Sequence, residues 1–222
     1  MKKIFSYILL STALLSCQSE IEPLPSENGE PSLVDKVFSA SVSTRTALSG
    51  SSVSWDSSDK VSVFDGKANR RFSVSVDTES AIIYGKAANA SSYCLLYPYD
   101  DAAEYSSGMV KTMLPDTQRP LKEGFDENAN LLCTVVQGTE VSMHNVCGLL
   151  KFTISSTDIS GIRLTSVGGE KFAGHVTVEL SDPASPAVKS ATSDCLHILP
   201  VDGKAFQPGT YCVSLAPVTM AS

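Results

Sequence analysis

Hydrophobic and polar residues alternate with a period of two in many short segments of this chain. In the first segment, Phe38, Ala40 and Val42 alternate with serines. The same alternation recurs at 72–77, 150–155, 172–180 and 211–215, and an apolar run at 131–136 also suits a strand. A period of two is typical of half-buried β-strands, and no window of comparable length has a helical period. Turn-forming pairs such as Asp65-Gly66 and Asp202-Gly203 separate the segments, which predicts strands joined by turns.

Many short strands with regular turn signals predict an all-β chain built from antiparallel β-sandwiches. The chain is long enough for two of them in tandem. A polar patch, Gln137 to Glu140, follows the strand expected at 131–136. We therefore place an N-terminal β-sandwich at residues 33–138 and a C-terminal one at 139–222.

The first residues have the pattern of an export signal. Lys2 and Lys3 precede an apolar run, Ile4 to Leu15, that is too short to span a membrane. The run ends in Leu-Ser-Cys, which resembles the lipobox of bacterial lipoproteins. We predict a signal peptide at 1–16, cleavage between Ser16 and Cys17, and lipidation of Cys17, with stable anchoring by its acyl chains. The alternative is an ordinary signal peptide with an incidental cysteine.

The next segment, 17–32, is rich in proline and glutamate and poor in apolar residues. Such a composition cannot bury enough apolar surface to offset the entropy of ordering, which predicts a flexible acidic spacer. It resembles the acidic stretches that direct some Gram-negative lipoproteins to the outer face of the outer membrane. The expected location is therefore the cell outer membrane, with the protein lipid-anchored and exposed at the surface.

The overall composition argues against some classes of partner. The chain is 42% hydrophobic and 18% charged, which is typical of a globular protein, and its formal net charge is −7. No basic stripe is present that could neutralise phosphates, so a nucleic-acid partner is not expected.

Motifs for metal, cofactor or catalytic chemistry are not apparent in the sequence. Besides Cys17, the cysteines are Cys94, Cys133, Cys147, Cys195 and Cys212, with no C-x-x-C pair. The histidines, His144, His175 and His197, are far apart in sequence, and Asp126 to Gln137 lacks the glycine and glutamate of a calcium loop. We expect no metal, no cofactor and no enzymatic activity. The cysteines are interpreted as small buried hydrophobes, with a disulfide between some pair left open.

A longer pattern resembles a known family. Residues 38–64, FSASVSTRTALSGSSVSWDSSDKVSVF, are similar to the opening of fimbrillin-family (Mfa-like) lipoproteins. The matching residues there are Thr44, Arg45, Thr46, Trp55, Asp59, Lys60, Val61 and Phe64. Later matches are Tyr97-Pro98, 130–132, 141–154, 161–164 and 172–174. The resemblance implies two transthyretin-like β-sandwich domains, a lipidated precursor, and assembly into type V pili by strand donation between subunits.

The individual residues of this pattern can also be interpreted as structural, independently of the resemblance. Trp55 is expected to anchor the core of the first sandwich, and Thr44, Asp59, Lys60 and His144 are expected to be structural. Arg45 either forms an ion pair or, as pilin maturation in the family implies, is cleaved by an arginine-specific protease before Thr46. Family members usually continue past the last strand seen here. The second sandwich is therefore expected to be either truncated or short and open.

These observations lead to one main functional hypothesis. We expect a structural cell-surface lipoprotein that acts as a fimbria or pilus subunit, or as an anchor or tip accessory, and contributes to adhesion. Its expected partners are the outer membrane, other fimbrial subunits and surface glycans or proteins of the host or of bacteria. Two routes would open an accepting groove: cleavage after Arg45, or missing strands after Leu215. The alternative is a glycan-binding or adhesive lipoprotein that does not polymerise.

Overall fold

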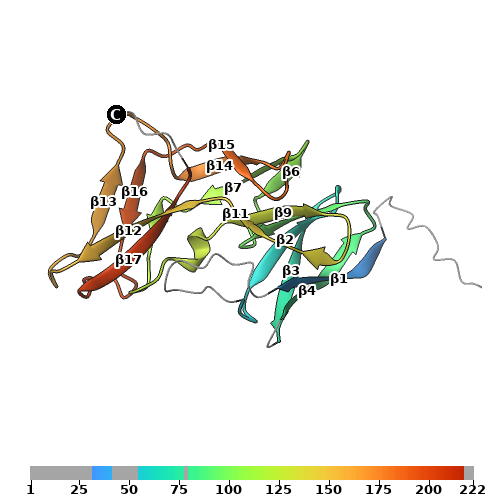
Figure 1. The fold of residues 1–222 in the computed structure, drawn as a ribbon, viewed down its shortest axis with the longest axis horizontal. Coiled ribbons are helices and arrows are strands. Elements are labelled where there is room, and N and C mark those ends of the chain that lie inside the picture. Colours follow the sequence, from blue (N-terminus) through green and yellow to red (C-terminus); the bar gives the residue numbers. More distant parts are fainter. Residues whose placement is uncertain (1–31, 42–54, 78–79, 218–222) are drawn as a thin grey trace, which may run out of the picture. The chain divides into compact units, whose positions relative to one another are not determined.

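The structure, a computed structural model, describes residues 32–41, 55–77 and 80–217. Every regular element in these ranges is a β-strand, except for a short 3₁₀-helix at Glu127–Ala129 (Figure 1). The all-β expectation is therefore confirmed, whereas the arrangement as two tandem sandwiches stays a prediction. No helix in these ranges is long and apolar enough to cross a membrane.

The largest sheet has eight strands in the order β10-β1-β4-β3-β2-β5-β9-β11. Its members are β1 (Leu33–Ser41), β2 (Lys60–Phe64), β3 (Asn69–Val76), β4 (Ser80–Ala88), β5 (Tyr93–Tyr97), β9 (Leu132–Val136), β10 (Glu140–Val141) and β11 (His144–Asn145). β1 pairs with β4 in antiparallel fashion along all nine of its residues. Each side of the sheet ends in a strand of only two residues.

One face of this sheet carries a closed hydrophobic core. The alternating residues that the sequence pattern assigns to one face are buried here, including Phe38, Phe72 and Val74. Strands pack closely against these rings: a Cβ added at Gly85 would lie 2.8 Å from the ring of Phe72. Glycine at position 85 therefore lets β4 lie flat against the phenylalanine.

Three smaller sheets contain the remaining strands. One has the order β15-β14-β7-β6 and comprises β6 (Glu104–Ser106), β7 (Met109–Leu114), β14 (Gly174–Glu179) and β15 (Ala187–Ser190). A second has the order β13-β16-β8 and comprises β8 (Thr117–Gln118), β13 (Ile162–Thr165) and β16 (Cys195–Ile198). The third, within the described residues, consists of β12 (Gly148–Ile154) and β17 (Gly209–Leu215).

Several strand pairs connect the two sides of residue 138. β7 pairs with β14, β8 pairs with β16, and β1 pairs with β10. A hydrophobic cluster also combines Leu96 and Val110 with Val176. The segment 104–118 therefore forms its sheets with strands of the predicted second domain. The boundary at residue 138 stays a prediction, and these pairings are long-range contacts that local alternation does not report.

A separate cluster of buried residues fills the C-terminal part of the fold. Its members come from the β12–β17 pair, from β16 and from the connecting segments at 172–173 and 206: Ile154, Phe172, Ala173, Leu196, Ile198, Phe206, Tyr211 and Val213. Several apolar residues that pack against this cluster are only partly buried. This incomplete burial leads to the candidate site.

Candidate functional site

The candidate site is the outer edge of β12. Along its whole length β12 pairs with β17, from Gly148 opposite Leu215 to Ile154 opposite Gly209. On its other side, no backbone partner is found for β12 in the part of the chain that the structure describes. An unpaired strand edge presents a row of N–H and C=O groups that can accept another strand.

The other edge of the pair is covered, which makes β12 distinctive. The buried side chain of Gln118 accepts from the Ser214 N–H at 2.9 Å and donates to the Ser214 carbonyl at 2.8 Å. Next along the strand, the Glu123 N–H donates to the Thr210 carbonyl at 2.7 Å, and the Cys212 N–H donates to the Gly124 carbonyl at 2.8 Å. The loop at 118–124 thus acts as a substitute neighbour for β17.

Side chains on β12 support the same interpretation. Leu150 lies opposite Val213 and Phe152 lies opposite Tyr211, so both side chains are on the core side of the sheet. Val213 is completely buried, yet Leu150 keeps 39% of its surface exposed. The ring of Phe152 stacks on Tyr211 at 6.0 Å between centroids but is itself only partly buried. The core side of β12 is therefore open along its outer edge.

β13 shows the same pattern on the opposing sheet. Ile162 and Leu164 lie opposite the buried Ile198 and Leu196 of β16, and both pack on the C-terminal cluster while remaining partly buried. Within the described ranges, β13 pairs only with β16. β12 and β13 are both edge strands, and both contribute apolar side chains to the C-terminal cluster. These side chains are incompletely covered.

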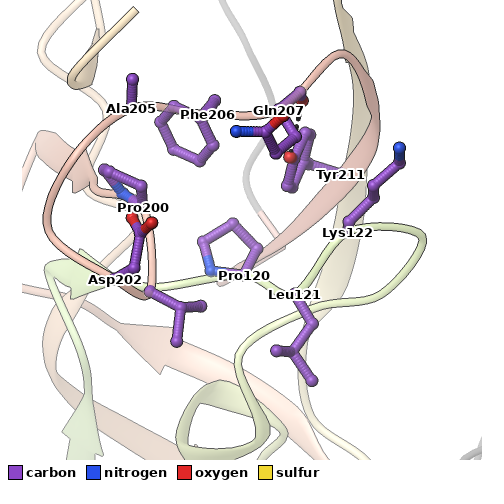
Figure 2. A pocket seen from close by; sticks show the side chains of 10 residues that line it. Pro120, Leu121, Lys122, Pro200, Asp202, Ala205, Phe206, Gln207 and Tyr211 are labelled. Atoms are coloured by element: carbon purple, nitrogen blue, oxygen red, sulfur yellow. Dashed lines mark hydrogen bonds between the residues drawn. The ribbon is translucent and has the colours of Figure 1, made fainter. Parts of the chain in front are cut away.

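A cavity lies beside β17, against Tyr211. It has a volume of about 200 Å³ and an apolar lining formed mainly by Pro120, Leu121, Pro200, Val201, Phe206 and Tyr211. Figure 2 shows the rings of Pro120, Pro200, Phe206 and Tyr211 grouped around it. The rings of Phe206 and Tyr211 meet edge to face at 5.1 Å, and the Tyr211 hydroxyl donates to the Gln207 carbonyl at 2.7 Å. A space of this size fits an apolar side chain better than a larger ligand.

A second, larger hollow lies over β7 and β14. Its volume is about 480 Å³, and Glu104, Lys111, Met113 and His175 are among its lining residues. The Asp100 carboxylate at its side accepts from the Thr112 hydroxyl at 2.8 Å. Glu104 pairs with Lys111 at 3.2 Å. The charged groups here already have partners within the protein.

Some of the predicted functional residues lie outside the described ranges. These are Ser16 and Cys17, the proposed cleavage and lipidation positions, and Thr44, Arg45 and Thr46. The signal peptide at 1–16 and nearly all of the spacer at 17–32 also lie there. Their roles stay predictions.

Trp55 and Asp59, two residues of the expected structural set, both contact one tyrosine. Trp55 is 3% exposed and meets the ring of Tyr97 edge to face at 5.3 Å. The Tyr97 hydroxyl donates to the Asp59 carboxylate at 2.8 Å, and that carboxylate also accepts from the Asp56 N–H. Lys60 begins β2 directly after this turn. Trp55, Tyr97 and Asp59 therefore connect the turn before β2 to the core of the large sheet.

His144 and the cysteines are distributed over the strands. His144 lies half-buried in β11, opposite Cys133. Cysteines 94, 133, 147, 195 and 212 are all free in the structure. Burial raises the pKa of the Cys133 and Cys147 thiols to about 12, as expected for inert core residues. No group of three or more His, Cys, Asp or Glu side chains in the described ranges could hold a metal ion.

The cover on β17 was not predicted from the sequence. Gln118 lies between Pro115 and Pro120, in a segment without clear alternation, and its two hydrogen bonds reach β17 across nearly half the chain. The two prolines that bracket it were the available signal, because proline disfavours a continuous paired strand.

Comparison with known proteins does not assign this chain to a family. The chain matches no family model, no curated protein and no solved structure. The fold is all-β, and the site is a strand edge that has no partner among the described residues, beside an incompletely covered core.

Proposed function

We propose that this protein is a structural, non-enzymatic, lipid-anchored cell-surface lipoprotein that acts as a fimbria or pilus subunit or as an anchor or tip accessory. In this proposal it assembles with other subunits by β-strand donation and contributes to adhesion. Its lipid on Cys17 attaches it to the outer membrane. The resemblance to fimbrillin-family lipoproteins motivates the proposal, and the geometry of β12 supplies its physical basis.

The single observation that carries the proposal is the open edge of β12. A donated strand placed there would pair with the free backbone groups of a seven-residue strand. Its alternate side chains would cover Leu150 and Phe152, whose core-side surface is incompletely buried. Backbone pairing and burial of apolar surface would both stabilise the protein when a strand is added at this edge.

The Arg45 route would open a different edge. Cleavage between Arg45 and Thr46 would separate β1 from the rest of the chain, and β1 contributes the buried Phe38 and Ala40. The nine-residue pairing with β4 would be lost, leaving β4 at the edge of the large sheet. Because Cys17 lies before the cut, a cleaved molecule would lose its lipid and become a shaft or tip subunit. An uncleaved molecule would remain as an anchor.

The test is expression of the full-length gene in a piliated Gram-negative host. Strand-donated polymers should appear as heat-sensitive, detergent-resistant ladders on gels. Leu150→Lys places a charge on the core side of the accepting edge and should remove the ladder. The control is Val76→Lys, because Val76 is exposed to 41% and lies in β3, which pairs on both sides. The control should keep the ladder.

The outcomes separate the parts of the proposal. Ladders that persist in Leu150→Lys would contradict the β12 edge as the acceptor. Ladders lost in Arg45→Ala but kept in Leu150→Lys would assign the β1 route instead. No higher-order species in any strain would count against polymerisation itself.

The lipid anchor has its own test. Cys17→Ala should abolish incorporation of labelled palmitate and leave an unprocessed precursor. A variant that still incorporates the label would contradict the assignment of Cys17.

The hollow over β7 and β14 favours a second candidate, a glycan-binding surface lipoprotein that does not polymerise. Its volume of about 480 Å³ suits a small ligand, and His175 offers a hydrogen-bonding group next to the 40% exposed Met113. Purified protein that stays monomeric yet is retarded by a polysaccharide in affinity electrophoresis would favour this candidate.

A further inference from the structure

Three chemically active side chains meet on the outer face of the β13–β16–β8 sheet. Arg163 on β13 lies opposite His197 on β16, and Cys195 precedes His197 by two residues on the same strand. Residues that alternate with them, Leu164 and Leu196, pack in the C-terminal cluster. The strand period therefore places Arg163, Cys195 and His197 together on the solvent side.

Contacts within this group centre on the sulfur of Cys195. Arg163 Nε donates to Cys195 Sγ at 3.1 Å, and His197 Nε2 lies 3.6 Å from the same sulfur. The hydrogen bond to Cys195 is the largest cause of a raised pKa at Arg163. Nearby, Lys171 pairs with Asp194 at 2.9 Å. A guanidinium that donates to sulfur favours the thiolate, which is the nucleophilic form of cysteine.

The other four described cysteines have different surroundings. Cys94, Cys133 and Cys212 are buried, and Cys147 lies beside the second core cluster. Burial raises the pKa of all four thiols, which disfavours the reactive form. Cys195 is partly exposed to solvent and in contact with a cationic donor. Access and charge thus distinguish Cys195 from the other described cysteines.

We propose that Cys195 is a modification site that reacts with low-molecular-weight disulfides by thiol–disulfide exchange. Its thiolate attacks one sulfur of the small disulfide, a new S–S bond forms to Cys195, and the original S–S bond breaks. The other half leaves as a thiolate and takes up the proton that Cys195 gave up. The protein thiol is oxidised, half of the small disulfide is reduced, and no further oxidant is needed. This inference is independent of the pilus proposal.

Arg163 and His197 have separate roles in this step. The guanidinium of Arg163 donates to the attacking sulfur through the 3.1 Å contact and stabilises the negative charge that the sulfur carries during attack. The imidazole of His197 is close enough to accept the proton from Cys195 and to pass it to the departing thiolate. Because both side chains are exposed, a small disulfide can approach from solvent without unfolding the sheet.

The experiment incubates the purified full-length chain with oxidised glutathione under native conditions. Peptide mapping by mass spectrometry then gives the rate of mixed-disulfide formation at each cysteine, with Cys17 scored separately. We expect Cys195 to react at least tenfold faster than Cys94, Cys133, Cys147 and Cys212. Cys195→Ser should remove that adduct without changing the melting temperature.

Variants of the neighbouring arginine test the mechanism. Arg163→Gln should slow the reaction of Cys195 about three- to tenfold, and Arg163→Lys should restore part of the rate. Arg71→Gln is the matched control, because Arg71 is an exposed arginine that lies over the ring of Tyr99. A Cys195 rate equal to that of the buried cysteines, or unchanged in Arg163→Gln, would overturn the proposal.

Discussion

The large sheet and the β12–β17 pair differ in the length and charge of the strands at their edges. The large sheet ends in β10 and β11, strands of two residues each, and the exposed half of β1 carries the charged residues Asp35 and Lys36. β12 instead presents seven residues with a single charged side chain, Lys151. Short strands and charges are the usual means by which proteins block unwanted strand addition. The β12 edge is therefore longer than β10 and β11 and carries fewer charges than the exposed half of β1.

The hydrophobic cores beside these edges also differ in how fully their side chains are buried. The core of the large sheet contains residues such as Val61, Phe72 and Ile83 that have no exposed surface. The C-terminal cluster is bordered by Phe152, Ile162 and Leu164, which remain partly exposed. Among the described residues, the large sheet therefore covers its core, whereas the C-terminal cluster leaves an edge and apolar side chains that are only partly covered.

The largest expected effect is in the core of the large sheet. Trp55→Ala should lower the free energy of unfolding by about 3 to 5 kcal/mol, because it removes a large buried aromatic and its contact with Tyr97. Urea denaturation measures the loss. Trp55→Phe is the control and should lose much less. A Trp55→Ala protein of unchanged stability that has lost a glycan or protein partner would make Trp55 a binding residue instead.

The next largest effect on stability is expected at Asp65, and this effect depends on pH. Burial raises the pKa of Asp65, but the N–H groups of Ala88, Ala68 and Lys67 and the side chain of Arg70 outweigh burial and hold it at about 2. A lowered pKa means that the stabilisation is complete above the ordinary value of 3.8 and is lost as the pH falls towards 2.

Asp65→Asn should therefore cost about 1 to 3 kcal/mol at pH 7, and the difference from the native chain should shrink between pH 4 and 2. Chemical denaturation at several pH values measures it. Asp35→Asn is the control, because the ion pair between Asp35 and Lys86 is exposed and should contribute little. A difference that stays constant down to pH 2 would contradict the role given to the Asp65 charge.

In the C-terminal cluster the same kind of truncation should matter less. Phe152→Ala should cost the isolated monomer about 1 to 2 kcal/mol, less than a fully buried aromatic, because one side of the ring is already open. The same change should cost the assembled form more, since a donated strand would bury that side. Equal losses in monomer and polymer would argue against burial of Phe152 on assembly.

The smallest effect on stability is expected at Leu150. Leu150→Lys should change the unfolding free energy of the monomer by about 0.5 kcal/mol or less, because the long side chain can reach solvent past the 39% exposed position. Val76→Lys should change the stability of the monomer equally little, as measured by thermal unfolding. A large loss of stability in Leu150→Lys alone would mean that this edge is already closed in the monomer.

Local alternation predicted the strands well because it reports which face of a strand is buried. Phe38, Phe72, Val178 and Val213 all lie on the buried faces expected for them. It could not predict sheet membership, because the pairing of β7 with β14 depends on contacts between distant segments. The cluster of Arg163, Cys195 and His197 was missed for the same reason, since it requires the register of β13 against β16.

Hydrogen exchange on purified monomer and on purified polymer tests the central claim most directly. The amides of β12, residues 148–154, can be followed by mass spectrometry together with those of β17. If β12 accepts a donated strand, exchange in 148–154 should slow strongly in the polymer, while β17, already paired on one side and covered by the 118–124 loop on the other, should change much less. Unchanged exchange at β12 in a polymer that is protected elsewhere would contradict the account.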